Sequence, residues 1–389
     1  MTQRRADPVR ALGALFVGYS LLFLGTGALQ QITIPLLKNT RPWSGDMLYW
    51  VMPTIYFAQA ACRLPITHVI RRLGLGWSLR IGGLSYLLAG WAITMAPQYW
   101  MAIAGMVAWG IGSSAFWASG AAHLLQATRE GRYGRYSGAL FAAVDVGFIA
   151  GVPLLSLIAA RAGYQWVAAF VLPASALGAL VLWLVPVQED EVKPASLSVI
   201  GRTLSQPWGR TAALLLFFAA CSFGTTLGIL AEQAGARSAG PVALLTCFYV
   251  ARILTNIFGG RLSDRAGRGV VAGGAFALAA GGAALTAATR GATFALPLGS
   301  AALGMVFAAV PLTALALVGD HASEAERTTV YGSLFVWRDV GVASSMLLGH
   351  YLEKTLGGFA QAMWIFAGLW AVLAVFSLTL SRPPRTATS

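Results

Sequence analysis

Twelve apolar stretches follow one another along this chain, and each is close to the ~20 residues that a helix needs to cross the hydrocarbon core of a bilayer. Inside lipid, every backbone N–H and C=O group must be satisfied within the chain, so only helices and closed barrels span membranes. Continuous apolar stretches of this length predict helices. The spans are expected at 11–36, 47–70, 78–97, 99–127, 136–160, 164–186, 211–231, 241–262, 270–289, 292–318, 329–352 and 360–380. The sequence therefore predicts an all-α membrane protein.

The charged residues support this class and set the orientation. Only 11% of the residues are charged, against about 25% in a soluble domain, and 57% are hydrophobic. About 18 of the 27 Lys and Arg residues fall at the two termini and in the loops on their side of the membrane, and about six fall in the opposite loops. Because positive loops stay on the cytoplasmic side, we expect both termini in the cytoplasm and the chain in the inner membrane of a bacterium. The net charge of +13 is thereby explained without a nucleic-acid partner.

One longer polar segment, 188–210, divides the twelve spans into six and six. It predicts an N-terminal six-helix half at 1–187, a cytoplasmic linker at 188–210 and a C-terminal six-helix half at 211–389. Since six plus six spans enclose their own cavity, we expect a monomer.

Two of the spans carry the same pattern, Gly-x-Leu-Phe-x-x-x-Asp-Val-Gly, at residues 138–147 and 332–341. Each copy places an aspartate, Asp145 or Asp339, where the bilayer would be. An ionisable group at that depth costs about 2.5 kcal/mol or more, so it is normally retained for function. Two copies about half a chain apart indicate a duplicated protein with facing halves, as in a secondary transporter.

The segment after the eighth span reads GGRLSDRAGRG, residues 259–269. It resembles the loop signature of the major facilitator superfamily, Gly-x-Leu-x-Asp-Arg-x-Gly-Arg. The matching residues are Gly260, Asp264, Arg265, Gly267 and Arg268.

The same signature is expected after the second span, where THVIRRLGLG at 67–76 matches it only in part. Arg72 and Gly74 fit, whereas Arg71 occupies the Asp position and Leu75 an Arg position. The resemblance implies a latch that holds the cytoplasmic side closed in the outward-open state. The alternative is that these charges only set the topology.

In the fifth span, Gly147 is followed by Gly151 and Pro153, with Val152 inserted between the last two. This resembles the Gly-x-x-x-Gly-Pro element of the proton-coupled exporters of the superfamily. Small residues at this spacing also allow close helix packing, which is the alternative interpretation.

Four buried charges are the candidate coupling groups. In the superfamily fold, the second span packs on the eleventh and the fifth on the eighth. Asp145 lies about nine residues into its span, and Asp339 lies at a similar depth in its own. Arg252 lies about ten residues, and Arg63 about seven, from the cytoplasmic end of the span that contains it. We therefore hypothesise two ion pairs between the halves, Asp145 with Arg252 and Asp339 with Arg63. Protonation of an aspartate would weaken its pair and open that side, unless the pairs are static.

The pairs also suggest different roles for the two aspartates, with Asp145 as the first choice for the coupling proton and Asp339 as a structural latch. Arg338 directly precedes Asp339 and lies about 100° from it around the helix axis. It has no obvious acidic partner in the sequence. It is a candidate contact for an anionic substrate.

In the superfamily fold, spans 1, 4, 7 and 10 line the substrate cavity. Polar and aromatic residues near their middles give hydrogen-bonding and stacking groups and no carboxylate, which favours a neutral or anionic, partly aromatic organic molecule. The same aromatic residues also occur on lipid-facing surfaces. The cavity candidates, with Arg338 added, are Gln30, Trp109, Ser113, Trp117, Thr225, Thr226 and Phe307.

The expected function is proton-coupled efflux of a small organic molecule, such as a drug, a secreted metabolite or a siderophore-like chelator, by alternating access. One alternative is proton-coupled uptake of an organic acid or sugar-like solute, and a second is a membrane sensor or scaffold that transports nothing. No Ser–His–Asp set, Gly-rich phosphate loop or metal-spaced His/Cys cluster is present, so neither an enzyme nor a metal site is expected. The proton gradient supplies the energy and no cofactor is expected.

Overall fold

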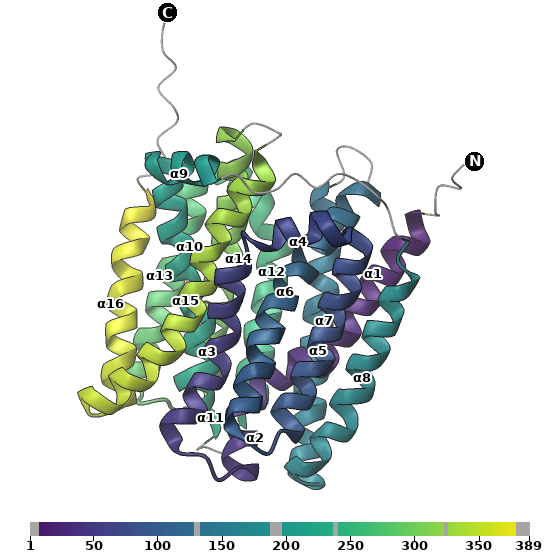
Figure 1. Cartoon of the computed structure of the whole chain (residues 1–389). Helices are drawn as coiled ribbons and strands as arrows, with labels where there is room; N and C mark the ends of the chain where they lie inside the picture. Colours follow the sequence, from purple (N-terminus) through teal and green to yellow (C-terminus); the bar gives the residue numbers. More distant parts are fainter. Residues whose placement is uncertain (1–7, 128–132, 187–196, 236–239, 323–325, 379–389) are drawn as a thin grey trace, which may run out of the picture. The chain divides into compact units, whose positions relative to one another are not determined.

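The computed structural model describes residues 8–127, 133–186, 197–235, 240–322 and 326–378 (Figure 1). Helices make up nearly all of these ranges, and no strand occurs in them. The all-α expectation is confirmed. Nine of the described helical segments are long and apolar enough to cross a membrane by length and composition. Three further long helices, α3, α5 and α15, complete the twelve predicted spans.

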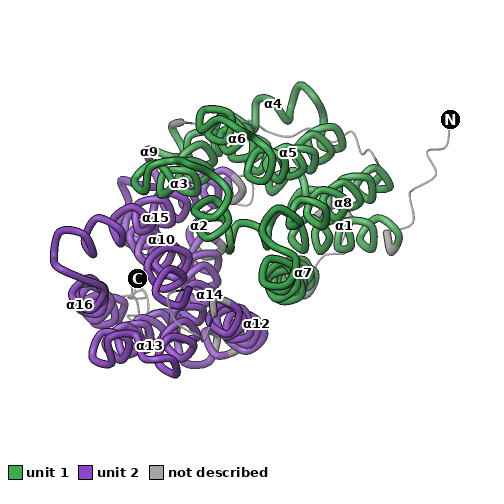
Figure 2. Tube along the Cα trace, turned by 90° about the horizontal axis from the view of Figure 1, so that it is seen from below, with its two compact units in different colours: residues 1–200 green, residues 201–389 purple. Residues whose placement is uncertain are grey.

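The chain divides into two compact units, Met1–Ile200 and Gly201–Ser389, coloured separately in Figure 2. The division falls inside the predicted linker 188–210, of which residues 187–196 lie outside the described ranges. Helix α9 (Leu197–Ser205) crosses the division. The predicted limits of the halves and the linker stay predictions.

The first unit contains six long helical segments. The first of them is α1, η1 and α2 joined end to end, and the last is α8 with a short 3-10 turn, η2 or η3, at each end. Their bounds are α1 Pro8–Leu22, η1 Phe23–Gly27, α2 Ala28–Thr40, α3 Gly45–Cys62, α4 Ile66–Leu73, α5 Leu75–Met95, α6 Tyr99–Ala127, α7 Tyr133–Arg161, η2 Tyr164–Trp166, α8 Val167–Val181 and η3 Leu182–Leu184.

The second unit repeats this series. Its first segment is again composite, made of α10, η4 and α11, and five long helices follow it. The bounds are α10 Pro207–Thr225, η4 Thr226–Leu230, α11 Ala231–Gly235, α12 Gly240–Ala266, α13 Arg268–Ala288, α14 Ala295–His321, α15 Arg327–Leu356 and α16 Phe359–Ser377.

The two units use the same packing scheme. In the first, α1 packs on α7 and α8, α3 packs on α6, and α5 packs on α6 and α8. In the second, α10 packs on α15 and α16, α12 on α14, and α13 on α14 and α16. The long helical segments of one unit therefore have equivalents in the other, as expected for a duplicated chain.

The first segment of each unit contains a π-helical turn, η1 at Phe23–Gly27 and η4 at Thr226–Leu230. A π-turn inserts one extra residue into the helix and occurs frequently at functional sites. In η4 the backbone leaves the helical region at Gly228, where ψ is −106°. The continuous apolar windows at 11–36 and 211–231 gave no sign of these interruptions.

The second predicted span, 47–70, is interrupted. Helix α3 ends at Cys62, a turn follows at 63–65, and a separate short helix, α4, begins at Ile66. Pro65 lies at this junction and has no N–H group for a helical hydrogen bond, which favours an interruption of the helix. On α4, Ile66 and Ile70 are buried while Arg71 and Arg72 are exposed. The helix is amphipathic, as expected for a segment at a membrane surface.

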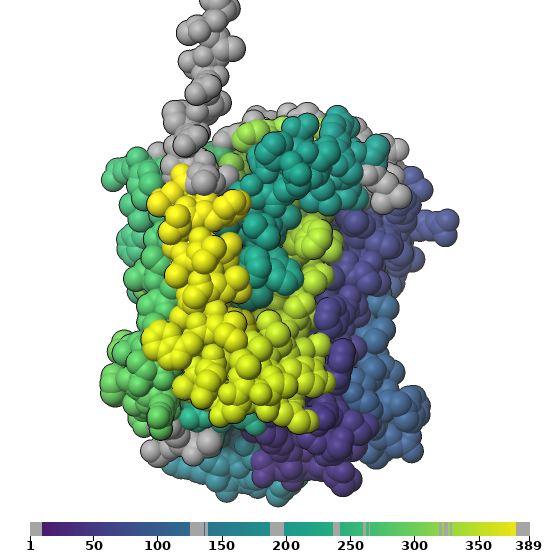
Figure 3. Space-filling view, turned by 90° about the vertical axis from the view of Figure 1, so that its left-hand side faces the viewer, coloured from purple at the N-terminus to yellow at the C-terminus, as the bar shows by residue number. Residues whose placement is uncertain are grey.

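Large apolar side chains cover the outer faces of the helices. In Figure 3, α16, in yellow, lies at the surface of the second unit beside α13 and the end of α15. Trp364, Ile365, Val372 and Val375 on α16 are exposed. Apolar faces of this kind fit a hydrocarbon environment.

Candidate functional site

Asp145 lies within α7 and is fully buried, and the neighbouring glycine explains how α7 is held. A Cβ atom on Gly147 would come within 2.5 Å of the Ser20 carbonyl oxygen and 2.9 Å of the Leu24 nitrogen. The same holds for Gly151, which meets the backbone of Leu24. Both glycines are therefore points where α7 crosses α1 and η1, as the packing interpretation of this spacing predicts.

Asp339 occupies the equivalent place in α15 and is also fully buried. Gly341, the last residue of the pattern, faces the backbone carbonyl of Phe217 on α10. Because Gly147 and Gly341 make the same contact with the first helix of their units, the repeated pattern has a structural meaning. It fixes α7 on α1 and α15 on α10, and it places one carboxylate beside each crossing.

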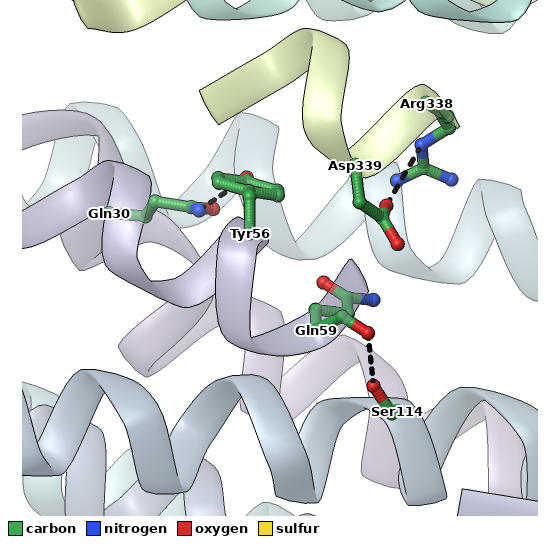
Figure 4. Close-up of polar contacts among 6 residues, drawn as sticks. All are labelled: Gln30, Tyr56, Gln59, Ser114, Arg338 and Asp339. Atoms are coloured by element: carbon green, nitrogen blue, oxygen red, sulfur yellow. Dashed lines mark hydrogen bonds and ion pairs between the residues drawn. The ribbon is translucent and has the colours of Figure 1, made fainter. Parts of the chain in front are cut away.

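An arginine accompanies the second aspartate. The Arg338 Nε atom lies 3.8 Å from Asp339 Oδ1, as drawn in Figure 4. The expectation that Arg338 has no obvious acidic partner is therefore wrong. Residues i and i+1 of a helix do not face each other, but the long arginine stem lets the guanidinium turn back. The Arg338 side chain keeps 23% of its surface exposed, whereas that of Asp339 keeps none.

Arg252 belongs to the same cluster. Its guanidinium carbon lies 5.4 Å from the centroid of the Phe307 ring on α14, and that of Arg338 lies 5.5 Å from the same centroid. Both distances are within the range of cation–π attraction. Four predicted site residues, Arg252, Phe307, Arg338 and Asp339, are thus brought together within one unit.

Glycine contacts also show which residues of the two units occupy equivalent positions near this cluster. Gly110 on α6 faces the Ile55 carbonyl of α3, and Gly304 on α14 faces the Phe248 carbonyl of α12. Three residues after these glycines come Ser113 and Phe307, which are therefore equivalent.

Two further pairs of equivalent residues follow from their distance along the chain to the Ile55 and Phe248 carbonyls and to the aspartate of the repeated pattern. Gln59 corresponds to Arg252, four residues after the carbonyl in each case, and Val144 corresponds to Arg338, one residue before the aspartate. The first unit thus has an amide and an isopropyl group where the second has guanidinium groups, and a hydroxyl group where the second has a phenyl ring.

The first-unit cavity candidates lie in a mixed polar and aromatic region. Gln30 on α2 donates from Nε2 to the Tyr56 hydroxyl of α3 at 2.5 Å, and the Ser114 hydroxyl donates to the Gln59 carbonyl at 3.1 Å (Figure 4). Ser113 is buried on the same helix as Ser114.

Two aromatic candidates take different positions in that region. The indole of Trp109 meets Tyr86 edge-on at 5.2 Å, while Trp117 touches the rings of Tyr19, Phe116 and Phe141. Trp117 therefore contributes to packing within the unit.

Thr225 ends α10 and Thr226 begins the π-turn η4, and both are fully buried. The Thr226 hydroxyl donates to the Ser222 carbonyl at 2.8 Å. The Thr225 hydroxyl, the Trp109 indole nitrogen and both amide atoms of Gln31 are buried and have no hydrogen-bond partner among the described residues. Such groups need a solute or water to satisfy them.

The signature segment 259–269 is helical for most of its length, because α12 continues to Ala266. Only Gly267 makes the expected turn, with φ of +92°, and Gly74 does the same before α5 with φ of +81°. Glycine adopts these angles without steric cost. Arg265 is exposed and Arg268 is partly buried, while the side-chain positions of Gly260 and Asp264 lie outside the described part.

Arg63 is the residue that directly follows α3, so it ends this helix instead of lying inside it. The proposed pairs of Asp145 with Arg252 and of Asp339 with Arg63 join residues of different units. The structure describes each unit by itself, and both pairs stay predictions.

Sequence reasoning missed the contacts of Phe307 with both arginines, the π-turns and the equivalence of Gln59 with Arg252. The glycines at 110 and 304 could have given that equivalence, since they lie 28 residues before the glycine that opens each copy of the pattern. Nothing in the sequence pattern marks a π-turn.

The family profile described as Major Facilitator Superfamily matches residues 15–242 and 211–389. A search of curated protein sequences finds no match.

Solved structures share the fold at low sequence identity. The E. coli fucose:proton symporter FucP is 15% identical with a TM-score of 0.69, and the match covers 97% of this chain and 100% of that chain. The human organic anion transporter MFSD10 is also 15% identical, with a TM-score of 0.71 over 96% and 100% of the two chains. An outward conformation of FucP gives 16% identity and a TM-score of 0.65 over 95% and 98%.

Proposed function

Since the chain belongs to the major facilitator superfamily, we propose that it is a proton-coupled secondary transporter that exports a small organic molecule by alternating access. The observation that supports this most is the pair of carboxylates, Asp145 and Asp339, each fully buried at the same place of its unit. A duplicated packing scheme alone would not need an acid in both copies. Burial makes the charged form costly, so each carboxylate is suited to exchange a proton during a conformational cycle.

The coupling step that we propose acts through ion pairs between the units, Asp145 with Arg252 and Asp339 with Arg63. A proton on either aspartate removes its negative charge and weakens the pair, and the cytoplasmic side is then released. The proton gradient drives the cycle and no cofactor takes part. Arg265, Gly267 and Arg268 belong to the cytoplasmic latch in this proposal, together with Gly260 and Asp264.

In this proposal the solute is held by buried polar groups that have no hydrogen-bond partner among the described residues. The Trp109 indole N–H, the Thr225 hydroxyl and the Gln31 amide offer hydrogen bonds to a neutral part of such a molecule. The remaining expectations, a monomer in a bacterial inner membrane with both termini cytoplasmic, belong to the same proposal.

Export is the proposed direction because Gly147, Gly151 and Pro153 resemble the exporter element. The tight contacts of both glycines with α1 and η1 give the element a packing role as well. Uptake by proton symport is the second candidate, and the contact between Arg338 and Asp339 favours it. A proton on Asp339 would release Arg338 for an anionic solute, so that proton and anion would move together.

Proteoliposomes that contain the purified protein and an internal pH dye test the coupling. A library of metabolites, drugs and chelators is added outside, and solute-driven pH changes are recorded with and without a protonophore. We expect at least one solute to move protons, and Asp145→Asn to abolish this movement. If no solute moves protons, or if neutralised aspartates leave the movement intact, the sensor or scaffold alternative gains and the proposal fails.

Direction is then decided in cells with the solute found in this way. Export predicts that cells with the protein hold less solute than cells without it, and that a protonophore removes the difference. Accumulation that collapses with the gradient would instead establish uptake.

A further inference from the structure

Arg80 lies near the beginning of α5, beside two tryptophan rings of the first unit. Its guanidinium carbon is 5.5 Å from the centroid of the Trp77 ring and 4.9 Å from that of the Trp183 ring. Both distances are within the range of cation–π attraction, and the two rings meet edge-on at 5.6 Å. Arg80 also donates from Nη2 to the Trp183 and Val185 carbonyls, at 3.2 and 3.4 Å. The arginine is therefore held where the beginning of α5 meets the end of η3.

The positive charge at this edge of the unit has no carboxylate beside it in the part of the chain that the structure describes. The hydrogen bonds and ring contacts of Arg80 are to carbonyl and indole groups, which are neutral. Arg71 and Arg72 on α4 are exposed, and they form no ion pair with a described residue either. Near the end of a membrane span, lipid phosphate is a source of the missing negative charge.

Both tryptophans are exposed on the apolar outer face of the unit. Trp77 is 48% exposed and precedes the exposed Ile81 on α5, and Trp183 is 44% exposed and precedes the exposed Leu184. Tryptophan is enriched where the hydrocarbon core meets the lipid headgroups. Arg80 is partly exposed and lies about 8 Å from the beginning of α5, at 1.5 Å per residue. Its surroundings are therefore those of a membrane interface.

Helix α4 continues this edge of the unit. Its buried residue Ile70 belongs to one apolar cluster with Leu75, the first residue of α5. Val69 and Leu73 are exposed although they are apolar, and Arg71 lies about 160° from both around the helix axis. A helix with this division fits the plane of a bilayer surface, with its apolar residues in the acyl chains and its basic residues among the headgroups.

We propose that Arg80, Trp77 and Trp183 form a binding site for the headgroup of an anionic phospholipid, at the edge of the first unit that is expected to face the cytoplasm. The Arg80 guanidinium binds the phosphate, and the two indoles lie at the boundary between headgroup and acyl chains. Arg71 and Arg72 add to the preference for a lipid with net negative charge. The site uses none of the residues proposed for proton coupling or solute binding, so it does not depend on the transport proposal.

Native mass spectrometry of the purified full-length protein in detergent tests this site. The probes are phosphatidylglycerol and phosphatidylcholine with the same acyl chains, and the measured quantity is the ratio of their apparent affinities for the first lipid bound. We expect the wild type to prefer phosphatidylglycerol by about fivefold or more, and Arg80→Gln to lower this ratio about fivefold, as for one arginine near a membrane surface. Trp183→Leu removes an exposed ring but keeps the charge, and it should lower the ratio about twofold.

Arg41→Gln is the matched control at the other end of α5. Arg41 also donates from Nη2 to a carbonyl, that of Thr94 at 2.8 Å, and the Nε atoms of Arg41 and Arg80 are both buried without a hydrogen-bond partner among the described residues. Within the same described ranges, however, no tryptophan ring lies under the Arg41 guanidinium. This variant should keep the lipid preference of the wild type. Size-exclusion profiles establish that each variant is folded, and Trp183→Leu decides if Arg80→Gln is not.

Equal binding of the two lipids by the wild type, or a preference that survives in both Arg80→Gln and Trp183→Leu, would overturn the inference. One competing occupant is the acidic segment 189–191, which follows Trp183 closely in the chain. It is tested with the triple variant Glu189→Gln, Asp190→Asn and Glu191→Gln. If only this variant shows a preference that depends on Arg80, the chain's own acids occupy the site and the lipid inference is wrong.

Discussion

The two units of this protein are built alike but charged differently. Gly147 and Gly341 make the same contact with the first helix of their units, and Gly110 and Gly304 make the same contact between the second and fourth helical segments. Around these shared contacts, the first unit places Gln59, Ser113 and Val144 where the second places Arg252, Phe307 and Arg338. Positions set by helix crossings have stayed the same after duplication, while positions that carry chemistry have diverged.

This difference shows why the buried aspartates are informative. Each unit keeps its carboxylate, although only the second unit has arginines on the neighbouring helix positions. An acid that served only as the partner of Arg338 would not be needed next to Val144. We therefore interpret the carboxylate as the shared function and the arginines as a specialisation of the second unit.

Placing a charge at the position of the first unit that corresponds to Arg338 should reduce the yield of folded protein more than any other change. Val144 is 1% exposed, so Val144→Arg places a guanidinium in a closely packed region at a cost of about 2.5 kcal/mol or more. We expect most of the folded protein to be lost, as measured by the monodisperse fraction in size-exclusion chromatography. Val144→Leu is the control. If Val144→Arg folds like the wild type, packing does not account for the neutral character of the first unit.

Adding a methyl group where α7 crosses α1 and where α15 crosses α10 tests the helix packing that the two units share. Gly147→Ala and Gly341→Ala should each cost about 1–3 kcal/mol, because the new Cβ would collide with a backbone carbonyl in both units. The melting temperature measures the loss. Gly332→Ala on α15 meets no atom within 4 Å and should keep or raise stability. Unequal losses at positions 147 and 341 would show that the two crossings are not equivalent.

The smallest effects are expected at hydrogen bonds that tie the first helical segment of each unit to a neighbouring segment. The Thr26 hydroxyl donates to the Tyr86 carbonyl at 2.8 Å in the first unit, and the Trp370 indole donates to the Phe218 carbonyl at 3.1 Å in the second. Thr26→Val nearly conserves volume and should cost about 1 kcal/mol in unfolding free energy. Trp370→Phe should cost about 1 kcal/mol for the hydrogen bond plus a further amount for the cavity left at a fully buried side chain. A neutral result in one unit only would show that the units differ in rigidity as well as in charge.

Much of the fold could be predicted because apolar length and loop charge depend on the chain alone. The twelve spans, the all-α class and the repeated pattern follow from that information. The break at Pro65 could not be located in this way, because Pro53 in the same window 47–70 also lacks an N–H group and lies inside α3. The π-turns at Phe23–Gly27 and Thr226–Leu230 could not be predicted either, because they depend on how the first segment packs against its neighbours.

The candidate site was predictable in kind but not in arrangement. Charged residues inside apolar stretches identify Asp145, Asp339, Arg252 and Arg338 without a structure. Their contacts depend on where long side chains turn, and a helical wheel places Arg338 away from Asp339 although the guanidinium reaches back to it. The contact of both arginines with Phe307 joins three helices, so the periodicity of the sequence along one helix cannot predict it.

Solute-driven proton movement in proteoliposomes tests the central claim most directly. The wild type, Asp145→Asn, Asp339→Asn and a surface control are compared with the most active solute, at equal protein content. Glu326→Gln is the control, because this carboxylate pairs with exposed Arg202 at 3.1 Å and has no part in the proposed site. The account predicts that Asp145→Asn abolishes proton movement but keeps solute binding, that Asp339→Asn lowers proton movement, and that the control moves protons like the wild type. Proton movement at the wild-type rate in Asp145→Asn would contradict it.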